Sequence, residues 1–358
     1  MASPRYTQIS LEQTPWYHVV SRCVRRAYLC GVDHISGESY EHRRDWLAQR
    51  IKQLAAIFTI DIAAYSIMHN HYHIVVRVDN ERVAGLSTLE VIQRWSQLYS
   101  GPLIIRRYLS DQREQMSQGE LLQVDKLADS YRQRLCDLSW FMKNLNEFIA
   151  RKANAEENVR GHFWESRYKC QALLDEPALL AAMAYVDLNP IRAAIAETPE
   201  QSEYTSVKQR VDAIDKPPAM PTNPADAEKM SHERCSQQDP LPPPAALLPF
   251  DPTESFLTSI PFAFSDYLEL VDIVGRALQP DKRGTIPETT PAILKRLGIN
   301  LACFIDHSDQ FLKRFGNNVG SSAKLIDLAA ARKVRYLRGV AQSRALFAAD
   351  AAGLAVSG

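Results

Sequence analysis

The stretch Ser66-Ile67-Met68-His69-Asn70-His71-Tyr72-His73-Ile74-Val75-Val76 combines a turn near residues 69–70 with an apolar strand. Side chains alternate along a strand, so His71 and His73 point to one face, whereas Tyr72 and Ile74 point the other way, into a core. At a rise of ~3.3 Å per residue the two imidazoles lie about 7 Å apart and can converge on one metal ion. Histidines are common in strands, and His69 has the same register. The pair therefore indicates a site only if the chain supplies a third ligand and a nucleophile.

Composition sets the class of protein. The chain has 358 residues, 46% of them hydrophobic, with 42 basic and 42 acidic side chains, so any DNA-binding surface must be a local patch. The six cysteines form no Cys-x-x-Cys pair, which argues against a zinc site or a disulfide framework. We expect a cytoplasmic protein, because the N-terminus does not resemble a signal peptide and no apolar run reaches membrane-spanning length.

The order of the expected elements predicts the fold. A β-like segment begins at residue 15, a helix covers 41–58, strands cover 60–67 and 71–78, helices cover 87–99 and 138–153, and a strand lies within 161–174. The order β-α-β-β-α-β is that of an α+β protein with a ferredoxin-like antiparallel sheet and helices on one face. Residues 101–137 read as an insertion that is helical around 121–134.

The composition along the chain predicts three segments, the first of which contains this sheet. Residues 1–214 form the first domain, residues 215–254 form a proline-rich linker, and residues 255–358 form a small all-α C-terminal module. We expect the helices of that module over 264–278, 290–297, 301–315 and 322–346. The sequence gives the module no role.

The helix before residue 190 brings two functional groups together. Asp175 is a suitable N-cap and Asn189-Pro190 ends the helix, so Tyr185 and Asn189 lie four residues apart on one face. The amide of Asn189 offers a carbonyl oxygen to a metal, and the phenol of Tyr185 can act as a nucleophile. Spacing alone leaves the other interpretation open, in which the tyrosine is a core residue and the asparagine a helix cap.

Three blocks together resemble a known family. Residues 68–76, residues 161–169 (Gly-His-Phe-Trp-Glu-Ser-Arg-Tyr-Lys) and residues 185–193 (Tyr-Val-Asp-Leu-Asn-Pro-Ile-Arg-Ala) resemble, in order and kind, the single-tyrosine transposases with a His-hydrophobic-His (HUH) motif, and among them the insertion-sequence 200-like and REP-associated tyrosine transposases. The resemblance covers about residues 10–210. His69 departs from it, since relatives often have proline there, and the 101–137 insertion and C-terminal module exceed the minimal domain.

The resemblance implies a mechanism and a substrate. It implies that His71, His73 and Asn189 hold a divalent metal, Mg²⁺ or Mn²⁺, and that Tyr185 attacks single-stranded DNA folded into imperfect, REP-like hairpins, giving a 5′-phosphotyrosine. The sequence leaves open whether the protein is a monomer or a homodimer. Candidate DNA-binding residues carry guanidinium, ammonium or aromatic groups, which suit phosphate contacts and base stacking: Arg22, Arg25, Arg26, Arg160, Trp164, Arg167, Tyr168, Lys169 and Arg192.

Several alternatives accompany this hypothesis. A solvated strand end would explain the arginines that follow residue 20, and simple strand packing would explain Trp164 and Tyr168. The whole protein could be a domesticated, catalytically silent protein that binds hairpin DNA, although a pure binder would not need all four site residues. A zinc hydrolase fits less well because the motif lacks a nearby acidic partner. Replication initiators and relaxases share the His-hydrophobic-His logic but fit the 185–189 block less well.

Overall fold

The protein is built on one five-stranded sheet. The computed structural model describes residues 8–24, 28–33, 36–215, 245–278, 291–308 and 311–347. Its strands are β1 (Trp16–Arg22), β2 (Ile60–Ile67), β3 (His71–Val78), β4 (Lys169–Leu173) and β5 (Asn318–Val319), in the order β2-β3-β1-β4-β5. The pairs β2–β3, β3–β1 and β1–β4 are antiparallel, and β5 pairs parallel with β4. The first four strands have the ferredoxin-like order, which confirms the predicted α+β fold. The fifth strand comes from the C-terminal part of the chain.

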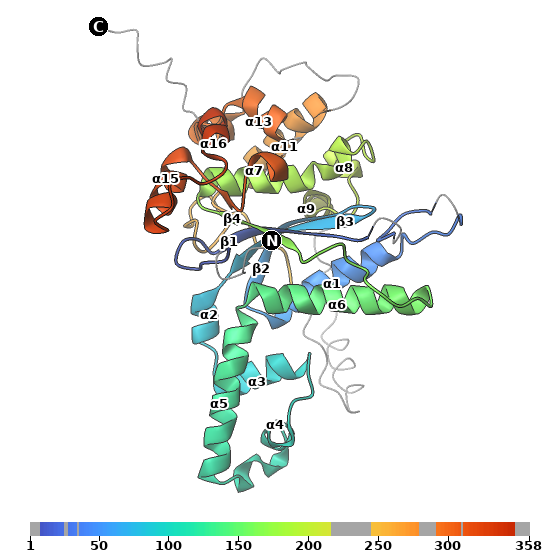
Figure 1. Ribbon diagram of the computed structural model, residues 1–358, viewed down its shortest axis with the longest axis vertical. Helices are drawn as coiled ribbons and strands as arrows, with labels where there is room; N and C mark the ends of the chain where they lie inside the picture. Colours follow the sequence, from blue (N-terminus) through green and yellow to red (C-terminus); the bar gives the residue numbers. More distant parts are fainter. Residues whose placement is uncertain are drawn as a thin grey trace.

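Helices cover both faces of the sheet (Figure 1). The two helices of the ferredoxin-like unit, α1 (Arg43–Ile57) and α6 (Leu138–Glu156), lie together on one face, as predicted. The other face carries α7 (Glu176–Asp187) and, above it, α11 (Phe264–Leu278) and α13 (Leu301–Ser308). The remaining helices are α2 (Asn80–Ala84), α3 (Thr88–Ser96), α4 (Leu103–Tyr108), α5 (Gln118–Leu135), α8 (Asn189–Arg192), α9 (Ser206–Asp215), α12 (Ala292–Arg296), α14 (Phe311–Arg314), α15 (Ser322–Ala331) and α16 (Val340–Leu346), with short 3₁₀ turns at Asp111–Gln115 and Pro199–Gln201.

The alternation of β1 and β3 divides the buried side chains between two cores. Tyr72 and Ile74 pack with α1 and α6, whereas Val75 and the apolar side of α7 form the second core. Phe304 and Phe311 from the C-terminal helices belong to that second core. The C-terminal helices therefore share their apolar interior with α7.

Helix boundaries differ from the sequence predictions where the backbone leaves the helical region. The predicted helix over 322–346 is two helices, α15 and α16. In the segment that joins them, Lys333 and Gly339 each have a positive φ, which interrupts the helix. The predicted stop at Asn189-Pro190 is a change of helix: α7 ends at Asp187, Leu188 follows, and α8 begins at Asn189. Pro190 is tolerated there because the first turn of a helix does not need its N–H.

Two further predictions concern the proline-rich linker and the 101–137 insertion. Residues 216–244, the larger part of the proline-rich linker, lie outside the described residues, and residues 245–254 pack on the first domain, where the Leu248 N–H donates to the Ile62 carbonyl. The 101–137 insertion forms α4 and α5, which extend away from the sheet (Figure 1).

Among the described residues, no helix combines the length and apolar character that a membrane crossing requires.

Candidate metal and nucleophile site

The sheet face on which α7 packs gathers a group of polar side chains. In the register of the sheet, residue 18 of β1 lies opposite residue 171 of β4, residue 20 lies opposite residues 73 and 169, and residue 22 lies opposite residue 71. Every second side chain of a strand shares a face, so three neighbouring strands contribute to one polar group. Its members are His18 and Arg22 from β1, His71 and His73 from β3, and Lys169 and Gln171 from β4.

The two histidines of β3 lie together at this face. Their ring centroids are 4.9 Å apart, with the ring planes at 75°. His73 is 1% exposed and its Nε2 has no hydrogen-bond partner, while Nδ1 of His71 lies 2.7 Å from the Asn70 side-chain oxygen. Burial, reinforced by the positive charge of Arg22, lowers the pKa of His71 to about 4, and burial holds the pKa of His73 well below its usual range. Both imidazoles are therefore neutral near pH 7, which is the form that ligates metals.

Tyr185 lies directly against His73. Its ring centroid is 5.4 Å from that of His73 in an edge-to-face contact. The Phe311 ring stacks on it at 5.2 Å, and the guanidinium carbon of Arg192 lies 3.9 Å from the ring centroid. The side-chain cap at the start of α7, where Asp175 accepts from the Ala178 N–H, fixes the beginning of the helix that carries Tyr185. The phenol is thus held between an aromatic ring and a cation, next to an imidazole.

Asn189 joins this group through Arg192. Its Oδ1 accepts a hydrogen bond from Arg192, which also donates to the Tyr185 carbonyl. Its Nδ2 is buried without a hydrogen-bond partner. The amide oxygen has two lone pairs, so it can accept from Arg192 and still offer one lone pair to a ligand.

The residues present fit a divalent metal. One buried nitrogen that can act as a ligand, Nε2 of His73, has no hydrogen-bond partner, and buried polar atoms are normally satisfied. Within the described part of the chain no three His, Cys, Asp or Glu side chains form a metal-binding group, so a site here depends on the asparagine oxygen as its third ligand. Two imidazoles and one amide oxygen are a donor set that first-row divalent ions accept.

Two residues that contact the site are not identified by the sequence patterns. His18 is fully buried, with Nε2 3.0 Å from Nδ1 of His73 and Nδ1 3.0 Å from Oε1 of Gln171. Gln171 is 3% exposed and donates from Nε2 to the Gly316 carbonyl at 2.8 Å. A histidine within the first predicted strand was the available signal. It is not decisive on its own, because the pairing of β1 with β3 and β4 cannot be read from local sequence.

The candidate DNA-binding residues divide between two places. Arg22 and Lys169 are exposed on the sheet face that carries the histidines, and Arg192 lies within the site. Arg25 and Arg26 lie outside the described residues. The structure therefore brings three of the nine predicted residues to the histidine and tyrosine group.

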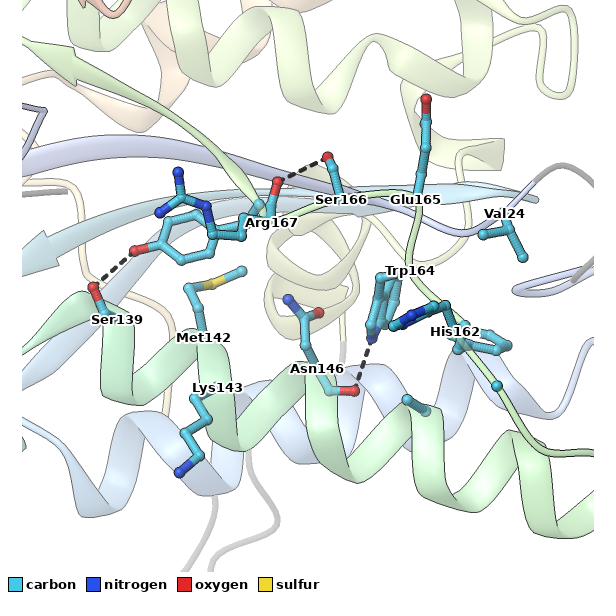
Figure 2. Close-up of a pocket in the computed structure, with 14 residues that line it drawn as sticks. Val24, Ser139, Met142, Lys143, Asn146, His162, Trp164, Glu165, Ser166 and Arg167 are labelled. Carbon is cyan, nitrogen blue, oxygen red and sulfur yellow. Dashed lines mark hydrogen bonds between the residues drawn. The ribbon is translucent and has the colours of Figure 1, made fainter. Parts of the chain in front are cut away.

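A second group surrounds a pocket of about 860 Å³ beside α6 (Figure 2). Trp164, Arg167 and Tyr168 line it, and the exposed Arg160 lies just before the first lining residue of the segment, Gly161. Trp164 packs edge-to-face on Tyr72 at 5.7 Å and donates from Nε1 to the Asn146 carbonyl. The hydroxyl of the buried Tyr168 hydrogen-bonds the Ser139 hydroxyl. These contacts give both aromatic rings a packing role. Because Trp164 touches Tyr72, this pocket lies on the α6 side of the sheet, opposite the histidine pair.

Comparisons with known proteins give one distant likeness. No protein-family model matches the chain, and no curated protein matches it. A solved structure described as "Structure of the REP associates tyrosine transposase bound to a REP hairpin" aligns with 59% of this chain and 86% of its own, at 11% identity and a TM-score of 0.34. At that identity and score, the likeness carries no conclusion about the activity of this chain.

Proposed function

We propose that the chain is a metal-dependent DNA transposase that nicks and rejoins single-stranded, hairpin-forming DNA through a 5′-phosphotyrosine. The observation that carries the proposal is the contact between Tyr185 and His73, whose ring centroids are 5.4 Å apart, beside a second imidazole from His71. A phenol next to paired neutral imidazoles, one of which has a buried nitrogen without a partner, supports a tyrosine nucleophile that acts beside a bound metal.

Each side chain has a defined part in the reaction. The phenolic oxygen of Tyr185 forms a bond to phosphorus while the bond from phosphorus to the 3′-oxygen breaks; the phenol loses its proton and the leaving 3′-oxygen gains one. A divalent ion, Mg²⁺ or Mn²⁺, held by His71, His73 and Asn189 would supply Lewis-acid polarisation of the scissile phosphate. The phosphodiester energy stays in the phosphotyrosine, so a second 3′-hydroxyl can reverse the step and join another strand.

The basic side chains around the site are suited to hold the DNA backbone. Arg22 and Lys169 are exposed on the same sheet face as His71, and their charges can contact phosphates on either side of the scissile one. Arg192 lies over the Tyr185 ring and bonds Asn189, so its charge stands next to the attacking group. A local cluster of this kind is compatible with a chain whose net charge is zero.

Metal removal tests the proposal directly. Labelled single-stranded hairpin DNA from the flanks of the protein's own gene is incubated with the full chain, with Mg²⁺ or Mn²⁺ and with chelator, and is resolved on a denaturing protein gel. We expect a covalent adduct that chelator reduces at least about a thousand-fold, because Lewis-acid stabilisation contributes several kcal/mol. Equal adduct formation in chelator would contradict the metal, and binding without any adduct would favour a silent hairpin-binding protein.

The matched variants His71→Ala and His69→Ala separate a ligand from a surplus imidazole. His71→Ala removes one of the two rings at the site and should lose the metal-dependent adduct. His69 is exposed and precedes the strand that carries the pair, so His69→Ala should retain the adduct. The opposite pattern, with His69 required and His71 dispensable, would place the metal elsewhere.

A further inference from the structure

A chain of hydrogen bonds runs from the C-terminal part of the protein to the buried histidine of β3. The Gly316 carbonyl meets Nε2 of Gln171 at 2.8 Å, Oε1 of Gln171 meets Nδ1 of His18 at 3.0 Å, and Nε2 of His18 meets Nδ1 of His73 at 3.0 Å. The three side chains are at most 3% exposed. The chain ends at Nε2 of His73, which has no hydrogen-bond partner.

The direction of every bond in this chain follows from its first member. A carbonyl oxygen can only accept, so Gln171 must present its NH₂ group to Gly316 and its oxygen to His18. The nitrogen of His18 that faces this oxygen must then carry the proton. A buried imidazolium is costly, so His18 is neutral and its other nitrogen accepts. Nδ1 of His73 therefore donates, and Nε2 of His73 carries the lone pair.

The first member is itself fixed by the sheet. β5 pairs with β4 immediately after Gly316: the Ala172 N–H donates to the Asn317 carbonyl and the Leu174 N–H donates to the Val319 carbonyl, both at 2.8 Å. The same segment carries Phe311, which stacks on Tyr185. The C-terminal part of the chain thus reaches the site at two points. One is the start of the hydrogen-bond series Gly316–Gln171–His18–His73, called the relay below, and the other is the ring of Tyr185.

We propose that the C-terminal segment around β5 fixes the tautomer of His73 through Gln171 and His18, so that Nε2 is presented to the metal as a lone pair. Gln171 and His18 are positioning residues, and the C-terminal module is a structural part of the site. The proposal rests on the proposed function for the metal, but the tautomer itself is a property of the metal-free protein. Supporting residues that orient a ligating histidine typically change metal affinity 10- to 100-fold when they are replaced.

The tautomer can be measured without DNA or metal. Long-range ¹H–¹⁵N correlation spectra of the ¹⁵N-labelled, chelator-treated full chain distinguish a protonated from an unprotonated ring nitrogen, and a His73→Gln spectrum assigns the signals of His73. We expect protonated Nδ1 and unprotonated Nε2 for both His18 and His73. A His73 that is protonated at Nε2 would overturn the proposal, because the relay would then run in the opposite direction.

Two variants of Gln171 test the coupling. Gln171→Met keeps the size of the side chain and removes both hydrogen bonds, so we expect His73 to shift towards the Nε2–H tautomer and Mn²⁺ to bind about 10- to 100-fold more weakly by calorimetry. Gln171→Glu, as the protonated acid that the facing Gly316 carbonyl favours, donates to Gly316 and accepts from His18, so the tautomer of His73 should be retained. The matched control is Gln209→Met, which removes a glutamine that accepts from Tyr65 away from this site and should leave His73 unchanged.

The outcomes separate this proposal from the proposed function. An unchanged His73 tautomer in Gln171→Met would overturn the relay even if the enzyme cuts DNA. The expected tautomers in a protein that binds no Mn²⁺ would overturn the metal site and leave the relay standing. If Gln171→Met does not fold, the wild-type spectrum decides the question, since it reports the protonated nitrogens of His18 and His73 and therefore the direction of the bonds.

Discussion

Tyr185→Phe should abolish the covalent DNA adduct and leave hairpin binding near the wild-type level. The substitution removes only the hydroxyl. The contacts that position the side chain involve its ring: the edge contact with His73, the stacking of Phe311 and the approach of the Arg192 guanidinium. A phenylalanine keeps all three. Loss of an enzyme's nucleophile can lower the rate on the order of 10⁶-fold, which in this case places the adduct below detection.

Two measurements and one control make the result specific. Adduct formation is followed on a denaturing gel, and hairpin binding is followed separately by mobility shift with the same DNA. Tyr72→Phe is the matched control, because Tyr72 lies between the two histidines of β3 but faces the opposite core, where its hydroxyl donates to Asn146. We expect Tyr72→Phe to keep the adduct. An adduct that persists in Tyr185→Phe would move the nucleophile to another residue.

The sequence was sufficient where the physical rule is local. Alternation along one strand placed the two histidines of β3 on one face and Tyr72 in the opposite core, and the structure confirms this arrangement. The order of strands and helices was sufficient for the ferredoxin-like sheet, because the succession β-α-β-β-α-β is that of this unit, whose strand order β2-β3-β1-β4 the structure shows. Helical spacing likewise suggested that Tyr185 and Asn189 lie near each other, and Arg192 connects them.

The sequence was insufficient where the contact depends on register or on distant pairing. His18 and Gln171 meet only because β1 lies between β3 and β4 in one particular register, which no local pattern specifies. The contact of Phe311 with Tyr185 and the pairing of β5 with β4 join segments more than 120 residues apart. The aromatic residues at 164 and 168 read equally as stacking or packing residues, since both roles select the same side chains.

Asp187→Ala should have the largest effect on stability, lowering the free energy of unfolding by about 3–5 kcal/mol. Asp187 lies two residues after Tyr185 and is 1% exposed. Its carboxylate accepts from the Ser206 hydroxyl, the Val207 N–H and the Tyr267 hydroxyl, at 2.5, 3.0 and 2.6 Å. Alanine would leave three buried donors without an acceptor, and each such donor costs about 1–3 kcal/mol before the structure relaxes.

The asparagine variant tests whether hydrogen-bond acceptance is the cause. Burial raises the pKa of Asp187, whereas its hydrogen-bond donors lower it. The ionised carboxylate is therefore stabilised by these donors and not by water. Asp187→Asn keeps an oxygen for the Ser206 and Val207 donors and can donate its NH₂ to the Tyr267 oxygen, so we expect a loss of only about 1–2 kcal/mol.

Urea unfolding followed by fluorescence measures both variants, with Asp272→Ala as the control. Asp272 forms an exposed ion pair with Arg276 on α11, and the loss of such a pair costs at most about 1 kcal/mol. An asparagine variant as unstable as the alanine variant would show that negative charge, and not hydrogen-bond acceptance, is what this position supplies. Because the partners of Asp187 come from α9 and α11, its loss should also loosen α7 from both helices. Tyr185→Phe adds no such loosening, so the two variants separate the chemistry of the phenol from the anchoring of the helix that carries it.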